Sequence, residues 1–72
     1  MKNIKKIKIK INGKIKYIIQ DSKLSELLNH LKIPLKKVAI ELNEEIIDKK
    51  KINRIKLKKK DNIEIVHFIG GG

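Results

Sequence analysis

The sequence predicts an α+β fold, a mixed sheet of four to five strands with one main helix packed on one face. Three observations predict it. Isoleucine and lysine alternate strictly between residues 7 and 11, leucines recur with helical spacing between residues 24 and 31, and a mainly apolar run covers residues 63–69. Two strands, then a helix that must cover them, then further strands, give a two-layer arrangement.

The first strand is expected to end in a hairpin. Its isoleucines share one face and its lysines the other, as in a half-buried strand, and Asn12-Gly13 follows as a turn signal. A two-residue turn would oppose the apolar face of the first strand to lysines of the second. We therefore expect a three-residue loop, 12–14, because register normally follows the buried face. This register pairs Ile11 with Ile15, Ile9 with Tyr17, and Ile7 with Ile19.

The helix is expected to begin after Asp21 and Ser22, two residue types that favour helix N-caps. It should end before Pro34, because proline disfavours helical geometry in the residue that precedes it. Its apolar stripe consists of Leu24, Leu27, Leu28 and Leu31.

Further strands are expected downstream. Alternation predicts a third strand at 38–42, and a polar turn at Asn43-Glu44 leads to a short edge strand at Ile46-Ile47. The lysine-rich stretch 48–60 reads as a connection with about one helical turn. The final strand, 63–69, is apolar enough to belong at the centre of the sheet.

The chain has room for a single domain and a small core, with 72 residues. We expect the domain to span residues 1–69 and a flexible glycine tail to occupy 70–72. No cysteine is present, which excludes disulfides and a thiol nucleophile. No apolar block resembles a signal peptide or a membrane span, so a cytoplasmic location without membrane contact is expected.

The three terminal glycines make the C-terminal carboxylate the leading candidate for a chemical site. Gly70, Gly71 and Gly72 lack Cβ atoms, and three extended residues reach about 10 Å, so they could thread a narrow slot in another protein. The alternative is a frayed end or a cloning remnant.

The formal charge of +11 has three interpretations. Lys, Ile and Asn make up more than half of the residues, a bias expected from A- and T-rich codons. The lysines on solvent-exposed faces can therefore result from codon bias and have no function of their own. Alternatively, they form a functional surface for an acidic partner. Nucleic-acid binding is the least favoured, because the chain has one arginine and only Tyr17 and Phe68 as aromatic residues.

The ending, the element order and the length together resemble the ThiS family, the sulfur carriers of thiamine biosynthesis with a β-grasp, ubiquitin-like fold. The similarity is carried by residues 64–72, by Asn12-Gly13-Lys14, by Leu27-Leu28 and by residues 38–43. The chain departs from the family at Glu44, where glycine is usual, and in its high lysine content.

This resemblance implies a carrier and not an enzyme, with no catalytic residues and no bound cofactor. The Gly72 carboxylate would be adenylated by an E1-like adenylyltransferase that uses ATP and magnesium, then converted to a thiocarboxylate by a persulfide. Thiazole synthase would take the sulfur, which a donor such as a cysteine desulfurase supplies indirectly. Gly70 and Gly71 would thread into these enzymes. The alternatives are the small subunit of molybdopterin synthase, with the same terminal chemistry, and a basic module for nucleic acid or anionic surfaces.

A partner surface is expected beside the tail. If Ile63 and Ile65 face the helix, alternation places intervening side chains on the other face of the sheet, where exposed apolar residues often mark contacts. Alternatively, Phe68 folds back over the edge of the core. His67 reads as structural, and no metal-binding set is apparent. The partner-surface candidates are Glu64, Val66, Phe68 and Ile69.

Overall fold

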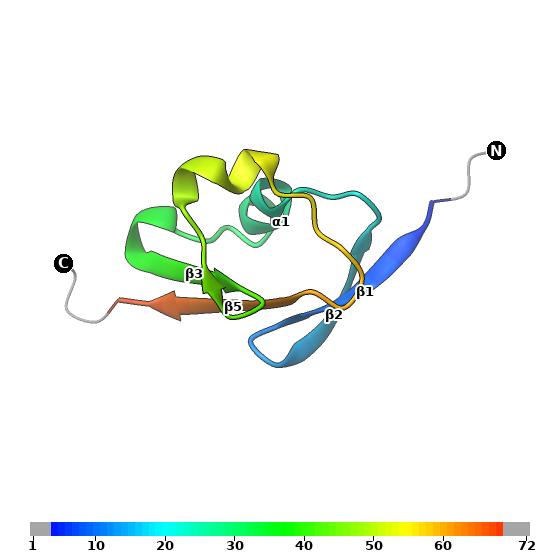
Figure 1. Cartoon of the computed structure of the whole chain (residues 1–72), viewed down its shortest axis with the longest axis horizontal. Coiled ribbons are helices and arrows are strands. Elements are labelled where there is room, and N and C mark those ends of the chain that lie inside the picture. Colours follow the sequence, from blue (N-terminus) through cyan, green and yellow to red (C-terminus); the bar gives the residue numbers. More distant parts are fainter. Residues whose placement is uncertain (1–3, 69–72) are drawn as a thin grey trace.

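The computed structural model describes residues 4–68 and shows the predicted mixed sheet with one main helix on one face (Figure 1). The last strand, predicted at 63–69, ends at His67, and Phe68 lies beyond it. Ile69 and the glycine tail, 70–72, lie outside the described residues. The elements in chain order are β1 (Lys6–Ile11), β2 (Lys14–Ile19), α1 (Leu24–His30), the 3₁₀ helix η1 (Leu35–Lys37), β3 (Val38–Leu42), β4 (Glu45–Ile46), the 3₁₀ helix η2 (Lys49–Arg54) and β5 (Asn62–His67).

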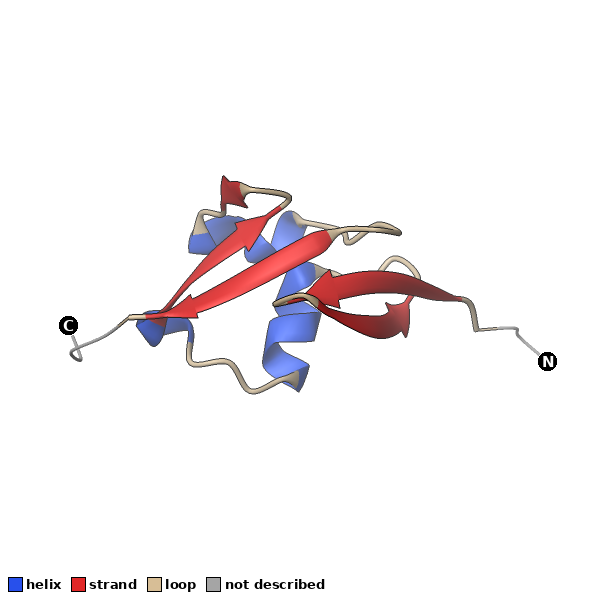
Figure 2. Ribbon diagram, turned by 90° about the horizontal axis from the view of Figure 1, so that it is seen from below, coloured by secondary structure: helices blue, strands red, loops and turns tan. Residues whose placement is uncertain are grey.

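The sheet has the strand order β2-β1-β5-β3-β4, so the last strand of the chain lies at its centre, as predicted. β5 runs parallel to β1 and antiparallel to β3. Figure 2 shows the helices on one side of the sheet, leaving the other side uncovered within the described part of the chain. We call this uncovered side the outer face.

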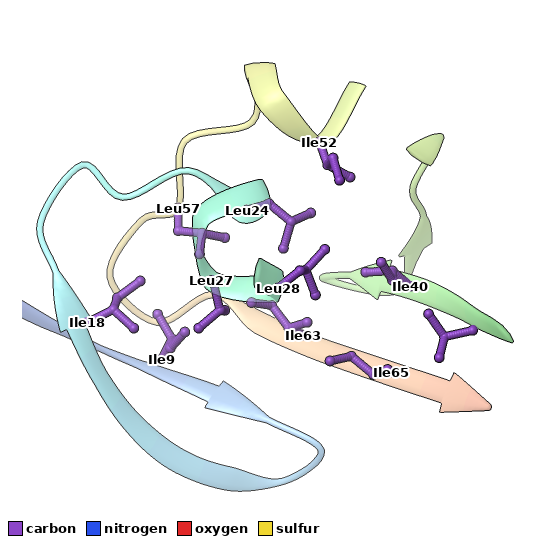
Figure 3. Packing of buried hydrophobic residues seen from close by; sticks show 11 residues of the cluster. Ile9, Ile18, Leu24, Leu27, Leu28, Ile40, Ile52, Leu57, Ile63 and Ile65 are labelled. Carbon is purple, nitrogen blue, oxygen red and sulfur yellow. The ribbon is translucent and has the colours of Figure 1, made fainter. Parts of the chain in front are cut away.

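The core lies between α1 and the sheet (Figure 3). The alternation predicted for β1, β3 and β5 and the leucine stripe of α1 account for most of it, with η2 and the strand-like segment after it closing one end. The buried apolar residues are Ile9, Ile18, Leu24, Leu27, Leu28, Val38, Ile40, Ile52, Leu57, Ile63 and Ile65.

The predicted register of the β1–β2 hairpin is wrong. The turn has two residues, Asn12 (φ 50°) and Gly13 (φ 80°), and it pairs Ile11 with Lys14. Positive φ at both positions is the turn geometry whose twist matches that of a hairpin, and Asn-Gly adopts it at low cost. The local preference of the turn outweighs apolar pairing, and Ile18 becomes the residue of β2 that reaches the core.

The helix begins after Asp21 and Ser22, as expected, but the prediction that these residues cap it is wrong. Lys23 is the N-cap, and the Glu26 carboxylate accepts a hydrogen bond from its backbone N–H at 2.8 Å. The Ser22 hydroxyl instead donates to the carbonyl of Ile19 at 2.6 Å. At the other end, the helix stops ahead of Pro34, because Lys32 turns the chain with a left-handed φ of 57°.

The β3–β4 turn has the same geometry as the first hairpin turn, with φ of 51° at Asn43 and 71° at Glu44. The predicted short edge strand at Ile46-Ile47 is present as β4, but it covers Glu45–Ile46, one residue earlier. Within the predicted connection 48–60, the helical turn is η2, which the Asp48 side chain caps by accepting from the backbone N–H of Lys50 at 2.9 Å.

Candidate functional site: the C-terminal end of β5

The central strand β5 is bonded along its length on the β3 side but only briefly on the β1 side. β3 pairs with it over five residues, whereas regular pairing with β1 covers Lys10–Asn62 and Ile11–Ile63. The Asn12 side chain continues the ladder where β1 has ended. Its Oδ1 accepts from the N–H of Ile65 at 2.8 Å, and its Nδ2 donates to the Ile65 carbonyl at 3.4 Å. An asparagine amide thus stands in for a peptide group beside β5.

The start of β5 is fixed by a second asparagine and a buried carboxylate. Asn43 Oδ1 accepts from the N–H of Asn62 at 2.8 Å, and Asn43 Nδ2 donates to Asp61 Oδ1 at 3.0 Å. Asp61 Oδ2 accepts from the N–H of Lys58 at 2.7 Å. Within residues 4–68 no buried side-chain polar atom lacks a hydrogen-bond partner, so these bonds hold the start of β5 in the sheet.

The ladder between β5 and β3 extends to the last described residue. The N–H of Phe68 donates to the carbonyl of Lys37 at 2.8 Å, one residue past the end of β5. Four of the predicted site residues follow it and lie outside the described part of the chain: Ile69, Gly70, Gly71 and Gly72. The sheet therefore holds the chain in place up to the residue before them.

The predicted alternation along β5 is observed. Ile63 and Ile65 are buried against the helix, and Glu64 lies on the outer face. Val66 is 51% exposed, and Phe68 is 52% exposed. Its ring lies 5.3 Å from the Lys49 ammonium, a cation–π contact that leaves half of the side chain in solvent.

Neighbouring residues of β3 and β4 extend this surface, although the sequence pattern did not assign them to it. Cross-strand pairing sets Ala39 opposite Val66, Glu41 opposite Glu64, and Ile46 opposite Glu41. Ile46 is 78% exposed, and a two-residue turn at 43–44 would have predicted its position. We call this surface the tail-side face; its members are Ala39, Glu41, Ile46, Glu64, Val66 and Phe68.

The titratable side chains of the described residues form no metal-binding group. No group of three or more His, Cys, Asp or Glu side chains in residues 4–68 lies close enough together to hold a metal ion. His67, read from sequence as structural, is exposed at the end of β5 opposite Val38. No helix in the described part of the chain is long and apolar enough to cross a membrane.

These features define a small β-grasp domain whose central strand leads to the C-terminus. Solved structures show the same class: the crystal structure of a thiamine biosynthesis protein (ThiS) from Geobacter metallireducens has a TM-score of 0.80 and 29% identity, covering 92% of this chain and 100% of that one. The model of the ThiS family matches residues 9–72. The chain belongs to the ThiS family.

Two curated relatives sharpen this assignment. The sulfur carrier protein ThiS of Bacillus subtilis is 38% identical over 65 residues, which cover 89% of this chain and 98% of that protein. A thiazole synthase of Paramagnetospirillum magneticum is 36% identical over 66 residues, or 92% of this chain but only 20% of the relative. The predicted family, fold and non-enzymatic carrier role are confirmed. The relatives support a sulfur carrier of thiamine biosynthesis and not the small subunit of molybdopterin synthase.

Proposed function

We propose that the Gly72 carboxylate is the group that carries sulfur. The observation that supports this most directly is that the family match runs through residue 72 and so includes the whole glycine tail. The chain has no cysteine, so the sulfur cannot be carried on a thiol of its own. A C-terminal carboxylate on glycine is an acyl group that a partner can reach through a narrow channel, because no side chain blocks the approach.

The chemistry begins with activation of the carboxylate. One Gly72 oxygen attacks the α-phosphorus of ATP, pyrophosphate leaves, and the acyl-adenylate that forms has a good leaving group where the carboxylate had none. The terminal sulfur of a persulfide then attacks the carbonyl carbon, and AMP leaves. A second thiol cleaves the sulfur–sulfur bond of this acyl disulfide and releases the thiocarboxylate. ATP and magnesium belong to the adenylating partner, and this chain binds no cofactor.

The partners follow from this chemistry. An E1-like adenylyltransferase activates Gly72, a sulfur donor such as a cysteine desulfurase charges the persulfide, and thiazole synthase accepts the sulfur in the cytoplasm. Two proteins named thiazole synthase contain a segment 36% identical to this chain over 66 residues, which supports pairing of such a carrier with that enzyme.

The tail-side face is the surface we propose for docking these enzymes. Val66 and Phe68 offer exposed apolar area immediately before the tail, and Glu64 lies two residues further back on the same face. A partner that holds this face while Gly70 and Gly71 enter its active site controls both the depth and the direction of Gly72. Ile69 lies between the two parts and completes the proposed contact.

Intact mass spectrometry after alkylation tests the proposal. The chain is purified from cells that contain the adenylating and sulfur-donating partners, treated with a thiol-alkylating reagent, and weighed. Since the chain has no cysteine, we expect one alkyl group per molecule, located at Gly72. A variant lacking Gly71 and Gly72 is the matched control and should remain unlabelled. Absence of label on the full chain, with partners and sulfur source present, would contradict the proposal.

A further inference from the structure

The edge strand β2 exposes apolar side chains that the core does not use. Ile15, Tyr17 and Ile19 are 57%, 63% and 55% exposed on the outer face of the sheet. They lie in one row, because alternate residues of a strand share a face. The β1–β2 pair occupies one end of the molecule, whereas β5 ends at the other (Figures 1 and 2). This row is therefore separate from the tail-side face.

Lysines surround the row. On β1, Lys6, Lys8 and Lys10 lie directly across from Ile19, Tyr17 and Ile15. On β2 itself, Lys14 and Lys16 project from the opposite, helix-side face. The sequence from residue 4 to residue 20 contains six lysines and no acidic residue. Both faces of this edge strand therefore carry lysines, and the hairpin itself has no acidic residue to offset them.

The backbone of β2 is open for pairing on its free side. In a two-residue hairpin the pair that flanks the turn, here Ile11 and Lys14, is hydrogen-bonded, and hydrogen-bonded pairs then alternate with pairs that are not. The bond from the N–H of Gln20 to the carbonyl of Lys5 at 2.9 Å shows that this alternation continues past the end of the strand. The N–H and C=O groups of Ile15 and Tyr17 therefore point away from β1, at the edge of the sheet.

A hollow lies along this strand on the helix side. It runs between β2 and α1 and is lined by residues that include Lys16, Ile18, Ser22, Glu26, Leu27 and His30. A strand laid along the free edge of β2 would send alternate side chains toward this hollow and toward the row of Ile15, Tyr17 and Ile19 on the outer face.

We propose that β2 accepts an extended segment of a partner protein as an added strand, and that this segment alternates apolar and acidic residues. Its apolar side chains pack on Ile15, Tyr17 and Ile19, and its carboxylates pair with Lys14 and Lys16 on the other face. Main-chain bonds to Ile15 and Tyr17 supply affinity, and the alternating side chains supply specificity. A second copy of this chain is a poor occupant, because it would bring an equally positive edge.

Titration of the full chain with a synthetic peptide tests the proposal. The probe is an N-acetylated, C-amidated eight-residue peptide that alternates valine and glutamate, and the control peptide carries lysine in place of glutamate. We expect the valine–glutamate peptide alone to bind and to slow amide hydrogen exchange at Ile15 and Tyr17 selectively. Binding without that protection, or equal binding of both peptides, would overturn the inference.

Variants separate the two kinds of contact. Replacement of Lys14 and Lys16 by glutamate should weaken peptide binding at least about tenfold. Replacement of Lys50 and Lys51, two exposed residues of η2, changes the net charge equally and should not weaken binding. Tyr17→Thr keeps strand propensity and removes apolar contact, so it should also weaken binding. Equal effects of the two charge reversals would refute docking at β2.

Two further outcomes are decisive. An oligouridine that competes with the peptide and loses affinity with the same variants would assign the surface to nucleic acid and overturn the proposal. Deletion of Gly71 and Gly72 should leave peptide binding unchanged, because β2 and the tail are separate sites. Absence of alkylation on the full chain, together with retained peptide binding, would count against the carrier chemistry and not against this surface.

Discussion

The two ends of the outer face of the sheet differ in charge although the chain carries a formal charge of +11. At the β1–β2 end, lysines alternate with exposed apolar residues. At the β5–β3 end, the strands place Glu41 directly opposite Glu64 beside exposed Val66. The net charge therefore does not describe the surface beside the tail. A partner that holds this surface meets two carboxylates, and one that holds the hairpin meets lysines.

The two ends also differ in how firmly the strands are held. β5 lies between two neighbours, and asparagine side chains bond its residues Asn62 and Ile65 where regular pairing is missing. β2 has one neighbour, and Ile18 is its one buried residue. Firm placement at the central strand suits delivery of a terminal group to a defined point, whereas an open edge suits pairing with another chain.

The largest expected difference is in stability. Ile63→Ala removes a fully buried side chain beneath α1 and should lower the free energy of unfolding by about 2–5 kcal/mol. Ile15→Ala removes an exposed one and should cost less than about 1 kcal/mol. Urea unfolding followed by circular dichroism measures both. Similar losses for the two variants would mean that the hairpin row is packed in solution and is not a free surface.

The second difference is in activation by the adenylating partner. Val66→Glu adds a third carboxylate to the tail-side face and should reduce kcat/KM for adenylation about thirtyfold, the size expected for loss of a central contact. Tyr17→Glu places the same charge on the hairpin and should leave the rate within about twofold. Pyrophosphate release provides the assay. A larger effect of Tyr17→Glu would show that this enzyme docks at the hairpin end of the sheet and not at the tail-side face.

Strong periodicity made the central parts of the fold predictable from sequence. Alternation identified β3 and β5, and it placed Val66 outside and Ile65 inside, because side-chain parity is fixed once one face is buried. The leucine spacing identified α1 for the same kind of reason. The outward direction of Val66 beside the tail accordingly follows from the sequence alone, whereas its role in docking stays a prediction.

The hairpin was not predictable in the same way, because two signals conflict there. Asn12-Gly13 favours a two-residue turn, whereas apolar pairing favours a three-residue loop, and the turn prevails. The contribution of Asn12 to β5 was also not visible. Its bonds to Ile65 join residues 53 positions apart, and no local pattern encodes such a contact.

The two Asn-led turns provide a third comparison. The β1–β2 turn has glycine at its second position, with φ 80°, whereas the β3–β4 turn has Glu44 there, with φ 71°. A left-handed conformation costs a residue with a Cβ about 1–2 kcal/mol, less the entropy that glycine adds to the unfolded chain. We expect Glu44→Gly to raise the free energy of unfolding by about 1 kcal/mol. Gly13→Ala is the reverse change and should lower the free energy of unfolding by a similar amount. Urea denaturation measures both variants. A loss of stability in Glu44→Gly would show that the Glu44 side chain stabilises the fold.

The smallest expected effect concerns the two carboxylates of the tail-side face. Glu41 and Glu64 are directly opposite on neighbouring strands, where like charges repel, so Glu64→Gln should stabilise the fold by about 0.2–1 kcal/mol at low salt. The gain should shrink as salt is added, because exposed charges are screened. Glu45→Gln, at an exposed edge position paired with Leu42, removes the same charge without relieving that contact and serves as the matched control. If the gain fails to depend on salt, or the control shows an equal gain, repulsion between the pair is not its source.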